Sequence, residues 1–295
     1  MILVTGASGF VGSHVLRRLE GRPRRAMVRD GARLRAGPEV EVVEADITRP
    51  ETLKAAVAGV DTIIHTAAIT ASQKEPYPGA YYEINQRGTE NLVMAARRAG
   101  VQRLVVMSGL GTRPAPEGTY MATRQGLEEA VRGSELPFVI LQPSVLFGDH
   151  AEFIEALAGL ARAFPVVPVL GRGDLKFQPL WVEDLVTCLL KAAEDRTLDG
   201  RSIPLGGSDY ATLREIQQTI SSVLGKRSLL VSLPLPLARI QARAMSALLP
   251  RPPLTPATLE LFSFENATTL DACEKAFGFR PRGFREHLLA HGLEG

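Results

Sequence analysis

A tyrosine and an arginine stand four residues apart in the stretch Y-M-A-T-R, residues 120–124. The surrounding sequence is typical of a helix that leads into a strand, and side chains four apart on a helix share one face. A cation beside a phenol favours the phenolate, so Tyr120 and Arg124 are a candidate acid–base pair. The alternative is that they are two polar side chains on a helix surface.

Three glycines follow an apolar strand at the start of the chain. Gly6, Gly9 and Gly12 come directly after residues 2–5, and a helix is predicted over residues 11–19. Glycine permits a tight turn and a close backbone approach to a pyrophosphate, whose charge the helix N-terminus favours. The pattern predicts a dinucleotide site rather than a purely structural turn. The loop residues expected around the phosphates also include Ser8, Phe10 and Val11.

The residue after the second predicted strand bears on the choice of dinucleotide. Residues 24–28 are followed by Arg29 and Asp30. An acidic residue at this place binds the 2′-hydroxyl of NAD, whereas a cation suits the 2′-phosphate of NADP. We therefore predict NADP(H), with NAD(H) as the alternative. Arg29 also belongs to an arginine-rich run, residues 17–35, which we interpret as a solvated rim because acidic residues interrupt it.

Short apolar runs alternate with helical patterns through the first half of the chain, which is typical of βαβ units around a buried parallel sheet. The predicted fold is α/β, a doubly wound Rossmann sheet with a smaller, mainly helical C-terminal substrate lobe. The dinucleotide-binding domain is expected at 1–148, with late sheet elements from about 176 to 205, and the lobe at 149–175 and 206–295. The predicted strands span residues 2–5, 24–28, 39–45, 61–67, 103–108 and 138–142, and a long helix spans about 80–99.

The composition is ordinary for a globular protein, with 295 residues, 45% hydrophobic, 22% charged and a formal net charge of +2. This balance excludes disorder and provides no field that favours nucleic acid. Cys188 and Cys273 lack metal-ligand spacing, so we expect no metal site, and Cys188 is predicted to be a buried apolar residue. The chain enters a strand without a signal peptide and has no apolar run long enough to span a bilayer, so a cytoplasmic location is expected.

A segment rich in proline and leucine, residues 229–254, lies in the predicted lobe. From Leu237 to Leu249 it is amphipathic, with Arg239 and Arg243 on one side. A helix that packs its apolar side on the lobe is the favoured interpretation. The alternatives are a lid over an apolar ligand and a peripheral contact with a membrane surface, both less favoured.

The order of these motifs resembles the extended or atypical short-chain dehydrogenases/reductases, of the NAD-dependent epimerase/dehydratase superfamily. The matching stretches, which run over essentially the whole chain, are T-G-A-S-G-F-V-G (5–12), A-D-I (45–47), H-T-A-A (65–68), N-Q-R-G-T-E-N-L (85–92), the Tyr120 helix, P-S-V-L-F-G (143–148) and Q-P-L-W-V-E-D-L (178–185). The tail is similar to the branch related to the NAD(P)H-binding accessory subunit of respiratory complex I, in P-L-T-P-A-T-L-E-L-F (253–262) and F-G-F-R-P (277–281).

The resemblance implies roles for individual residues around the cofactor. Asp46 would accept a hydrogen bond from the adenine amino group, with Ile47 against the ring. Asn85 falls where the family has a structural or relay asparagine, and we assign it no catalytic role of its own. The other implied cofactor contacts are His65, Thr66, Ala67 and Ala68 along its middle, Met107, Ser108, Tyr120 and Arg124 beyond them, and Pro143, Ser144 and Val145 at the nicotinamide end.

In the family, the tyrosine is the general acid/base of hydride transfer. The ordinary pKa of a tyrosine is about 10, and a lysine four residues on favours the phenolate. Here Arg124 stands in place of that lysine and keeps the charge, although its planar group reaches the ribose differently. The usual position of the catalytic hydroxyl is Leu110, so Ser108 is predicted to assist, with Thr112 as an alternative.

Two classes of function remain. We favour an oxidoreductase that transfers hydride between NADP(H) and an unidentified, apolar carbonyl or alcohol, with Phe147, Phe177 and Trp181 as candidate neighbours of the substrate. The alternative is an NADP(H)-binding sensor, or an accessory protein associated with a quinone or a lipid, without robust turnover. A nucleotide-sugar epimerase or dehydratase is a second alternative. The oligomeric state stays open.

Overall fold

The chain forms two compact units, each assembled from separate stretches of sequence. The computed structural model describes residues 1–34, 37, 39–249, 252 and 254–293. One unit comprises Met1–Ile69, Glu75–Gln142 and Leu185–Ile203, and the other comprises Thr70–Lys74, Pro143–Asp184 and Pro204–Gly295. Arg35, in the arginine-rich run, and Pro250, Arg251 and Pro253, in the segment rich in proline and leucine, lie outside the described residues.

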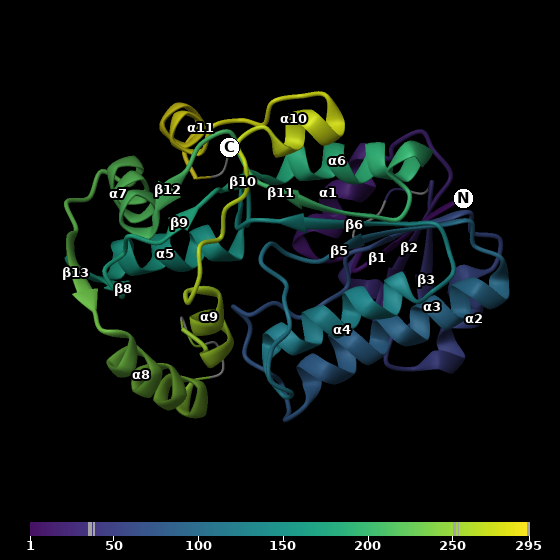
Figure 1. The fold of residues 1–295 in the computed structure, drawn as a ribbon, viewed down its shortest axis with the longest axis horizontal. Coiled ribbons are helices and arrows are strands. Elements are labelled where there is room, and N and C mark those ends of the chain that lie inside the picture. The colour runs from purple at the N-terminus through teal and green to yellow at the C-terminus, as the bar shows by residue number, and fades with distance from the viewer. Residues whose placement is uncertain (35–36, 38, 250–251, 253, 294–295) are drawn as a thin grey trace. The chain divides into compact units, whose positions relative to one another are not determined.

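The first unit is built on a sheet of seven strands (Figure 1). Its order is β11-β6-β5-β4-β1-β2-β3, and the paired strands from β6 to β3 run parallel. The strand order reverses between β1 and β4, which is where doubly wound folds bind dinucleotides. The predicted fold class is confirmed. The strands are β1 (Ile2–Thr5), β2 (Arg24–Val28), β3 (Val40–Glu44), β4 (Thr62–His65), β5 (Arg103–Met107), β6 (Phe138–Pro143) and β11 (Arg201–Leu205).

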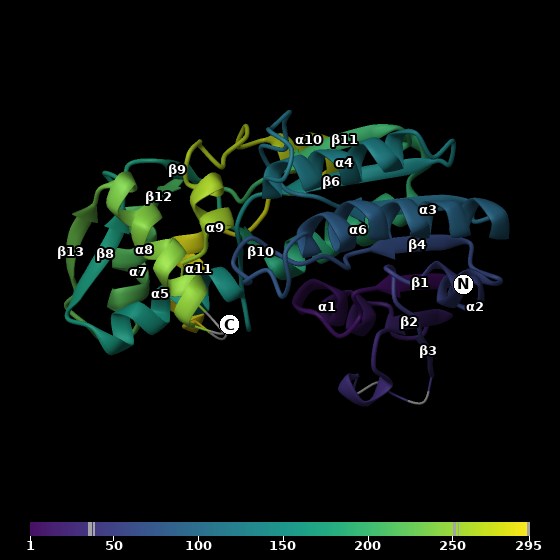
Figure 2. The same ribbon diagram turned by 90° about the horizontal axis from the view of Figure 1, so that it is seen from below.

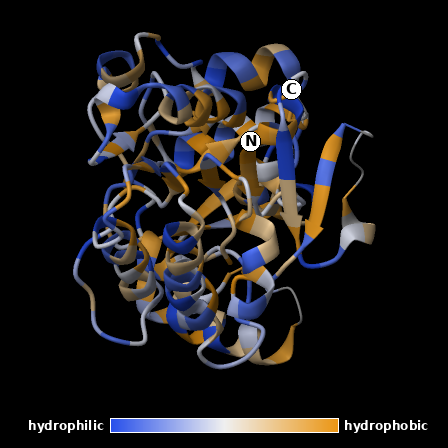
Figure 3. Ribbon diagram, turned by 90° about the vertical axis from the view of Figure 1, so that its right-hand side faces the viewer, coloured by the Kyte–Doolittle hydropathy of each residue, from blue (hydrophilic) through white to orange (hydrophobic). Residues whose placement is uncertain are grey.

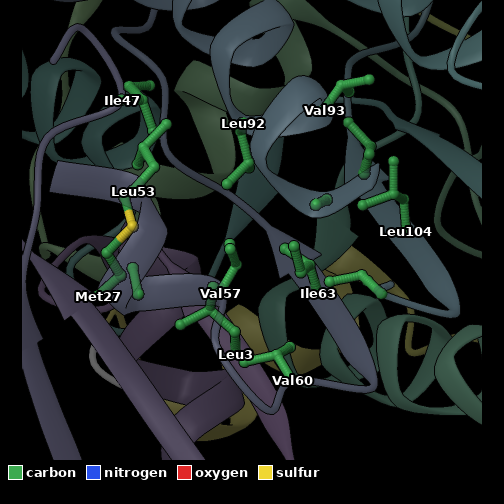
Figure 4. Close-up of a cluster of buried hydrophobic side chains, with 14 of the residues drawn as sticks. Leu3, Met27, Ile47, Leu53, Val57, Val60, Ile63, Leu92, Val93 and Leu104 are labelled. Atoms are coloured by element: carbon green, nitrogen blue, oxygen red, sulfur yellow. The ribbon is translucent and has the colours of Figure 1, made fainter. Parts of the chain in front are cut away.

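Helices cover both faces of this sheet (Figures 1 and 2). One face carries α1 (Phe10–Arg18) and α6 (Val182–Glu194), and the other carries α2 (Pro50–Val57), α3 (Gly88–Ala99) and α4 (Tyr120–Arg132). The inner strands are therefore rich in buried apolar residues such as Leu3, Val4, Ile63 and Ile64, and orange marks hydrophobic residues on the ribbon in Figure 3. The core between the sheet and the helices α2 and α3 is drawn in Figure 4 and includes Leu3, Leu53, Ile63, Leu92 and Leu104.

The long helix predicted over about 80–99 is two elements rather than one. Residues Tyr82–Arg87 form a π-helix, and α3 follows it directly. Asn85 lies in this wide turn, where its side chain accepts from the Ile69 N–H at 2.9 Å and donates to the Ile69 carbonyl at 3.0 Å. The amide thus fixes the chain after β4 to the helix, and π-helical turns are frequent at functional sites.

The interpretation of the arginine-rich run as a solvated rim is wrong for two of its members. Arg24 and Arg25 are buried in β2. Arg24 pairs with Glu39 at 2.6 Å, and Arg25 donates to the carbonyls of Ala56 and Ala58, both at 2.7 Å, at the end of α2. The two guanidiniums satisfy carboxylate and helix-end oxygens that would otherwise lack donors, which sequence spacing alone does not reveal.

The second unit combines short strand pairs with helices around an aromatic core. Phe147, Phe177 and Phe284 are fully buried there. Thr212 and Glu215 bond each other's backbone in a capping box at the start of α7. The elements are β7 (Leu146–Phe147), α5 (Glu152–Ala163), β8 (Val166–Leu170), β9 (Lys176–Phe177), β10 (Leu180–Trp181), β12 (Ala211–Thr212), α7 (Leu213–Val223), β13 (Leu229–Leu233), α8 (Leu235–Leu248), α9 (Pro256–Leu261), α10 (Ala272–Phe277) and α11 (Phe284–His291).

Two further observations concern the whole chain. Within the described residues, no helix is both long and apolar enough to cross a membrane. Cys188 is fully buried, as predicted, and Cys273 is buried as well. Both thiols are therefore shielded from solvent and behave as small apolar groups.

Candidate functional site

The turn between β1 and α1 is built for close backbone packing. Gly6 has φ +65°, and a Cβ there would lie 2.8 Å from the Ala67 nitrogen. A Cβ on Gly12 would lie 2.2 Å from the Gly6 carbonyl oxygen, so only glycine allows α1 to approach the turn this closely. Gly9 donates to the same carbonyl at 2.8 Å. No side chain caps the first turn of α1, and no acidic residue lies in it, so its N–H groups are available to an anion such as a phosphate.

Two predicted residues follow the neighbouring strands β2 and β3. Arg29 is exposed at the end of β2, and the adjacent Asp30 carboxylate accepts from the Ala32 N–H at 3.1 Å. Asp46 follows β3, where one carboxylate oxygen accepts from the backbone and the hydroxyl of Thr48, both at 2.9 Å. Asp46 is therefore held in a turn, half-buried, with Ile47 buried beside it.

His65, at the end of β4, lies in a closed chain of hydrogen bonds rather than in an open pocket. It is 1% exposed, its Nδ1 lies 2.6 Å from Thr5 Oγ1, and its Nε2 lies 3.0 Å from Thr89 Oγ1. Thr89 donates its own proton to the Asn85 carbonyl at 2.7 Å, so its oxygen must accept from Nε2–H. The imidazole is thus the Nε2–H tautomer, and burial lowers its pKa to about 4.

The backbone after His65 is more accessible than its ring. Thr66, Ala67 and Ala68 are half-buried or exposed, and the Thr66 hydroxyl donates to the Thr5 carbonyl at 2.8 Å. Both ring nitrogens of His65 are already bonded, to Thr5 and to Thr89. The imidazole of His65 therefore holds the strand and the helix together and has no ring nitrogen left for a ligand.

Tyr120 and Arg124 share one face of α4, as their spacing predicts. The guanidinium carbon lies 5.9 Å from the centre of the Tyr120 ring, and Tyr81 packs edge-on against that ring with centroids 5.2 Å apart. Arg124 is only 7% exposed. Its pKa is lowered by burial, although an arginine stays charged at neutral pH. A surface pair is excluded, because the charge is buried against the phenol.

The guanidinium of Arg124 occupies space that a side chain at residue 109 would fill. A Cβ on Gly109 would lie 2.2 Å from Arg124 Nη2 and 2.7 Å from Cζ. Nη2 also lies 3.4 Å from the Leu110 carbonyl oxygen. The loop after β5 therefore accommodates the larger arginine because residue 109 is glycine.

Ser108 is engaged with a buried carboxylate. Its hydroxyl donates to Glu128 Oε1 at 2.6 Å and lies 3.2 Å from Thr112 Oγ1. Glu128 also accepts from Gln142 at 2.8 Å and pairs with Arg132 at 2.6 Å. Both hydroxyls considered for the catalytic role thus lie together, half-buried, beside Glu128. Met107, half-buried at the end of β5, directly precedes them.

The last predicted cofactor contacts, Pro143, Ser144 and Val145, belong to the second unit. The Ser144 hydroxyl lies 2.7 Å from the side-chain oxygen of Asn266, which also accepts from the Val145 N–H at 3.1 Å. Asn266 is buried and comes from the C-terminal part of the chain. It fixes the backbone of this segment within its own unit.

Comparison with known proteins decides the family. The sequence profile of the NAD dependent epimerase/dehydratase family matches residues 2–206. The chain belongs to this family.

Similar proteins extend this result. Ceramide reductase of Caulobacter vibrioides is 30% identical over 240 residues, which cover 80% of this chain and 74% of that protein. The mitochondrial NADH dehydrogenase [ubiquinone] 1 alpha subcomplex subunit 9 of Arabidopsis thaliana is 22% identical over 307 residues, which cover 99% and 75%. The crystal structure of gox2253 matches with a TM-score of 0.76 and 26% identity, covering 100% of this chain and 99% of that one. The predicted resemblance is confirmed, and the family to which this chain belongs consists of NAD(P)-dependent enzymes.

Several residues of the site escaped the sequence analysis. Thr5 and Thr89 fix the tautomer of His65, Glu128 holds Ser108, and Gly109 makes room for Arg124. Thr5 lay within a motif, but its partner is 60 residues away. The helical spacing of Arg124 and Glu128, four residues, is the one signal that would have placed Glu128 near Tyr120 and Arg124.

The burial of neutral His65 predicts a loss of stability in acid. The folded-state pKa is about 4 and the ordinary value is 6.5, so below pH 6.5 the unfolded chain binds a proton that the folded chain excludes. The free energy of unfolding should fall by on the order of 2 kcal/mol from pH 6.5 to 5 through this group. Urea unfolding of the wild type and of His65→Gln at both pH values tests this. An equal pH dependence in the two proteins would contradict it.

The contact between Gly109 and Arg124 predicts that substitutions at the two positions depend on each other. Gly109→Ala should lower the free energy of unfolding by about 1–3 kcal/mol, because the new methyl group overlaps the guanidinium. In an Arg124→Lys background the narrower side chain should reduce that cost. Gly159→Ala is the control, since nothing lies within 4 Å of its added Cβ. Strictly additive losses in urea unfolding would refute the coupling.

Proposed function

We propose that this protein is an NADP(H)-dependent oxidoreductase that transfers hydride between the nicotinamide and an apolar carbonyl or alcohol substrate. The observation that carries the proposal is the pairing of Tyr120 with a buried Arg124 after β5. A dinucleotide fits the residues present, because a Cβ would close the glycine cradle and no side chain caps α1. Gly6, Gly9 and Gly12, with Ser8, Phe10 and Val11 beside them, would hold its phosphates.

The proposed chemistry needs one acid and one cation from the protein. When bound, the nicotinamide supplies the hydride for the carbonyl carbon or accepts it from the alcohol carbon. Tyr120 gives its phenolic proton to the carbonyl oxygen during reduction and takes it back during oxidation. Arg124 favours the phenolate that remains, and water screens this attraction little because the guanidinium is buried. Arg124 also replaces the lysine that orders the nicotinamide ribose.

The other predicted residues take supporting roles. Asp46 and Ile47 bind the adenine, the main chain of His65–Ala68 faces the middle of the cofactor, and Pro143–Val145 face the nicotinamide. Ser108 shares its hydroxyl with Glu128, so Thr112, 3.2 Å from Ser108, is an equal candidate for binding the carbonyl oxygen. The engaged serine is also what favours the second candidate function, an NADP(H)-binding accessory protein or sensor without robust turnover.

The preference for NADP(H) rests on Arg29. Its side chain is exposed at the end of β2, while the carboxylate of Asp30 caps the short helix Gly31–Arg33. The hydrogen bond from the Ala32 N–H holds the Asp30 carboxylate at the start of this helix. The guanidinium of Arg29, next to it in sequence, suits the 2′-phosphate of NADP. An apolar substrate is supported by the similarity to ceramide reductase, whose name denotes a lipid substrate.

Removal of the Tyr120 hydroxyl separates the two candidate functions. With NADPH and a panel of apolar ketones, aldehydes and quinones, Tyr120→Phe should turn over at least about 100-fold more slowly than the wild type. NADPH binding, measured by fluorescence titration, should change little. Tyr82→Phe is the control, since it removes a hydroxyl from an exposed tyrosine. Unchanged turnover in Tyr120→Phe would contradict the role assigned to Tyr120. Tight NADPH binding by a wild type that turns over no substrate of the panel would favour the accessory protein.

Arg29 is tested by comparing the two cofactors. Loss of a charge-assisted contact costs about 1.5–3 kcal/mol, so Arg29→Gln should bind NADPH roughly 10- to 100-fold more weakly. NADH affinity should stay nearly constant, because NADH lacks the 2′-phosphate. Arg98→Gln, an exposed arginine on α3, is the matched control. Tighter binding of NADH than NADPH by the wild type, in the same titration, would overturn the cofactor assignment.

A further inference from the structure

Exposed apolar side chains are concentrated in one region of the second unit. Among the described residues, eight of the fifteen large hydrophobic side chains that are exposed lie at 164–166 and 229–249. The helix α8 contributes Leu237, Ile240 and Leu248, which are 54%, 67% and 81% exposed. Scattered surface hydrophobics are ordinary, but a contiguous group marks an interaction surface.

The apolar side chains of α8 fall into two opposite stripes. Ala238 and Ala242 are fully buried and pack against Leu259, with Leu170 and Leu233 beside them. Leu237, Ile240, Ala244 and Leu248 lie within about 80° of arc on the side away from that contact, given 3.6 residues per turn. The helix therefore packs on its own unit, as predicted, but the side chains that make this contact are alanines. The larger apolar side chains face outward, and we call them the outer stripe.

The charges in the segment of sequence that carries the outer stripe are all of one sign. No aspartate or glutamate occurs between Glu215 and Glu260, and the same stretch contains Lys226, Arg227, Arg239, Arg243 and Arg251. Arg239 and Arg243 are exposed on α8. At 3.6 residues per turn, Arg243 lies about 60° and Arg239 about 100° around the helix from Ile240, the nearest residue of the stripe. In the described part of the chain, neither forms an ion pair with a carboxylate.

We propose that α8 docks the protein on an anionic phospholipid surface, lying flat with Leu237, Ile240 and Leu248 in the boundary between headgroups and acyl chains. A short amphipathic helix with leucines on one side and arginines beside them has the chemistry of an interfacial helix. With 14 residues, α8 is shorter than the roughly 20 that a spanning helix needs. The long arginine side chains reach lipid phosphates while their methylene groups stay on apolar surface.

A second copy of the chain fits this surface less well than a lipid bilayer does. In a two-fold dimer the same patch meets itself, so Arg239 and Arg243 of each copy would lie near those of the other. No acidic residue of the segment is present to neutralise them. An anionic lipid surface provides both the apolar phase and the opposite charge.

Flotation of the full-length protein with vesicles tests the proposal. We expect binding to vesicles of phosphatidylcholine mixed with phosphatidylglycerol, weaker binding to phosphatidylcholine alone, and weaker binding at high salt. The variant Leu237→Gln/Ile240→Gln/Leu248→Gln should lose at least about tenfold in partitioning, and so should Arg239→Gln/Arg243→Gln, at about 1 kcal/mol per arginine. The substituted side chains are exposed, so urea unfolding and NADPH binding should match the wild type.

Matched controls carry the same changes elsewhere on the surface. Met94→Gln/Leu270→Gln/Leu289→Gln removes three exposed apolar side chains, and Arg98→Gln/Arg201→Gln removes two exposed charges. Both should bind vesicles like the wild type. The proposal fails if the wild type floats with neither kind of vesicle, or if the α8 variants bind as well as the controls do. It also fails if the stripe variant keeps vesicle binding but turns a wild-type dimer into a monomer in sedimentation velocity.

Discussion

The close approach of the β1–α1 turn to its neighbours is the constraint on which the site depends. Gly12 lies against the Gly6 carbonyl, and Gly6 lies against the backbone of Ala67 after β4. These contacts bring the start of α1 to the point where the strand order reverses, between β1 and β4. A β-carbon at either glycine would push the helix or the strand away. The N-terminus of α1 would then no longer face the space where a dinucleotide phosphate belongs.

Buried polar groups then fix the edge of the sheet in one arrangement. His65 joins Thr5 on β1 to Thr89 on α3, and Glu128 on α4 joins Ser108 after β5 to Gln142 on β6. Each group would be costly to bury alone, so the strands and helices must keep their register to satisfy it. The same logic holds for Arg124, whose guanidinium is stable only where Gly109 leaves room and a phenol lies beside it. The contact between Tyr120 and Arg124 is thus a product of the packing.

The second unit follows a different principle, because its most exposed helix keeps its large apolar side chains outside. Alanines form the inner contact of α8, which allows close packing but buries little area. A helix held by so small a contact gains from a further apolar phase on its outer side. If lipid supplies that phase, an apolar substrate and the protein would meet at the same surface, which links the docking proposal to the proposed chemistry.

The sequence by itself determined the architecture and half of the site. Glycine spacing, alternating strands and helices, and the distance between Tyr120 and Arg124 are local patterns, and local patterns follow from backbone geometry. The doubly wound sheet, the glycine turn before α1 and the face shared by Tyr120 and Arg124 were therefore predictable.

Only the tertiary structure decided which polar side chains are already engaged in hydrogen bonds or ion pairs. The arginines of β2 looked like a solvated rim, yet Arg25 binds carbonyls more than 30 residues away at the end of α2. Ser108 looked free for catalysis, yet its hydroxyl bonds Glu128, and the long helix predicted near residue 85 widens into a π-turn around Asn85. Such pairings join elements that meet only when the chain is folded, and no spacing in the sequence encodes them. Local patterns in the sequence therefore determined the fold and the spacing of the candidate site residues, and the tertiary structure decided which of their polar groups are already bonded.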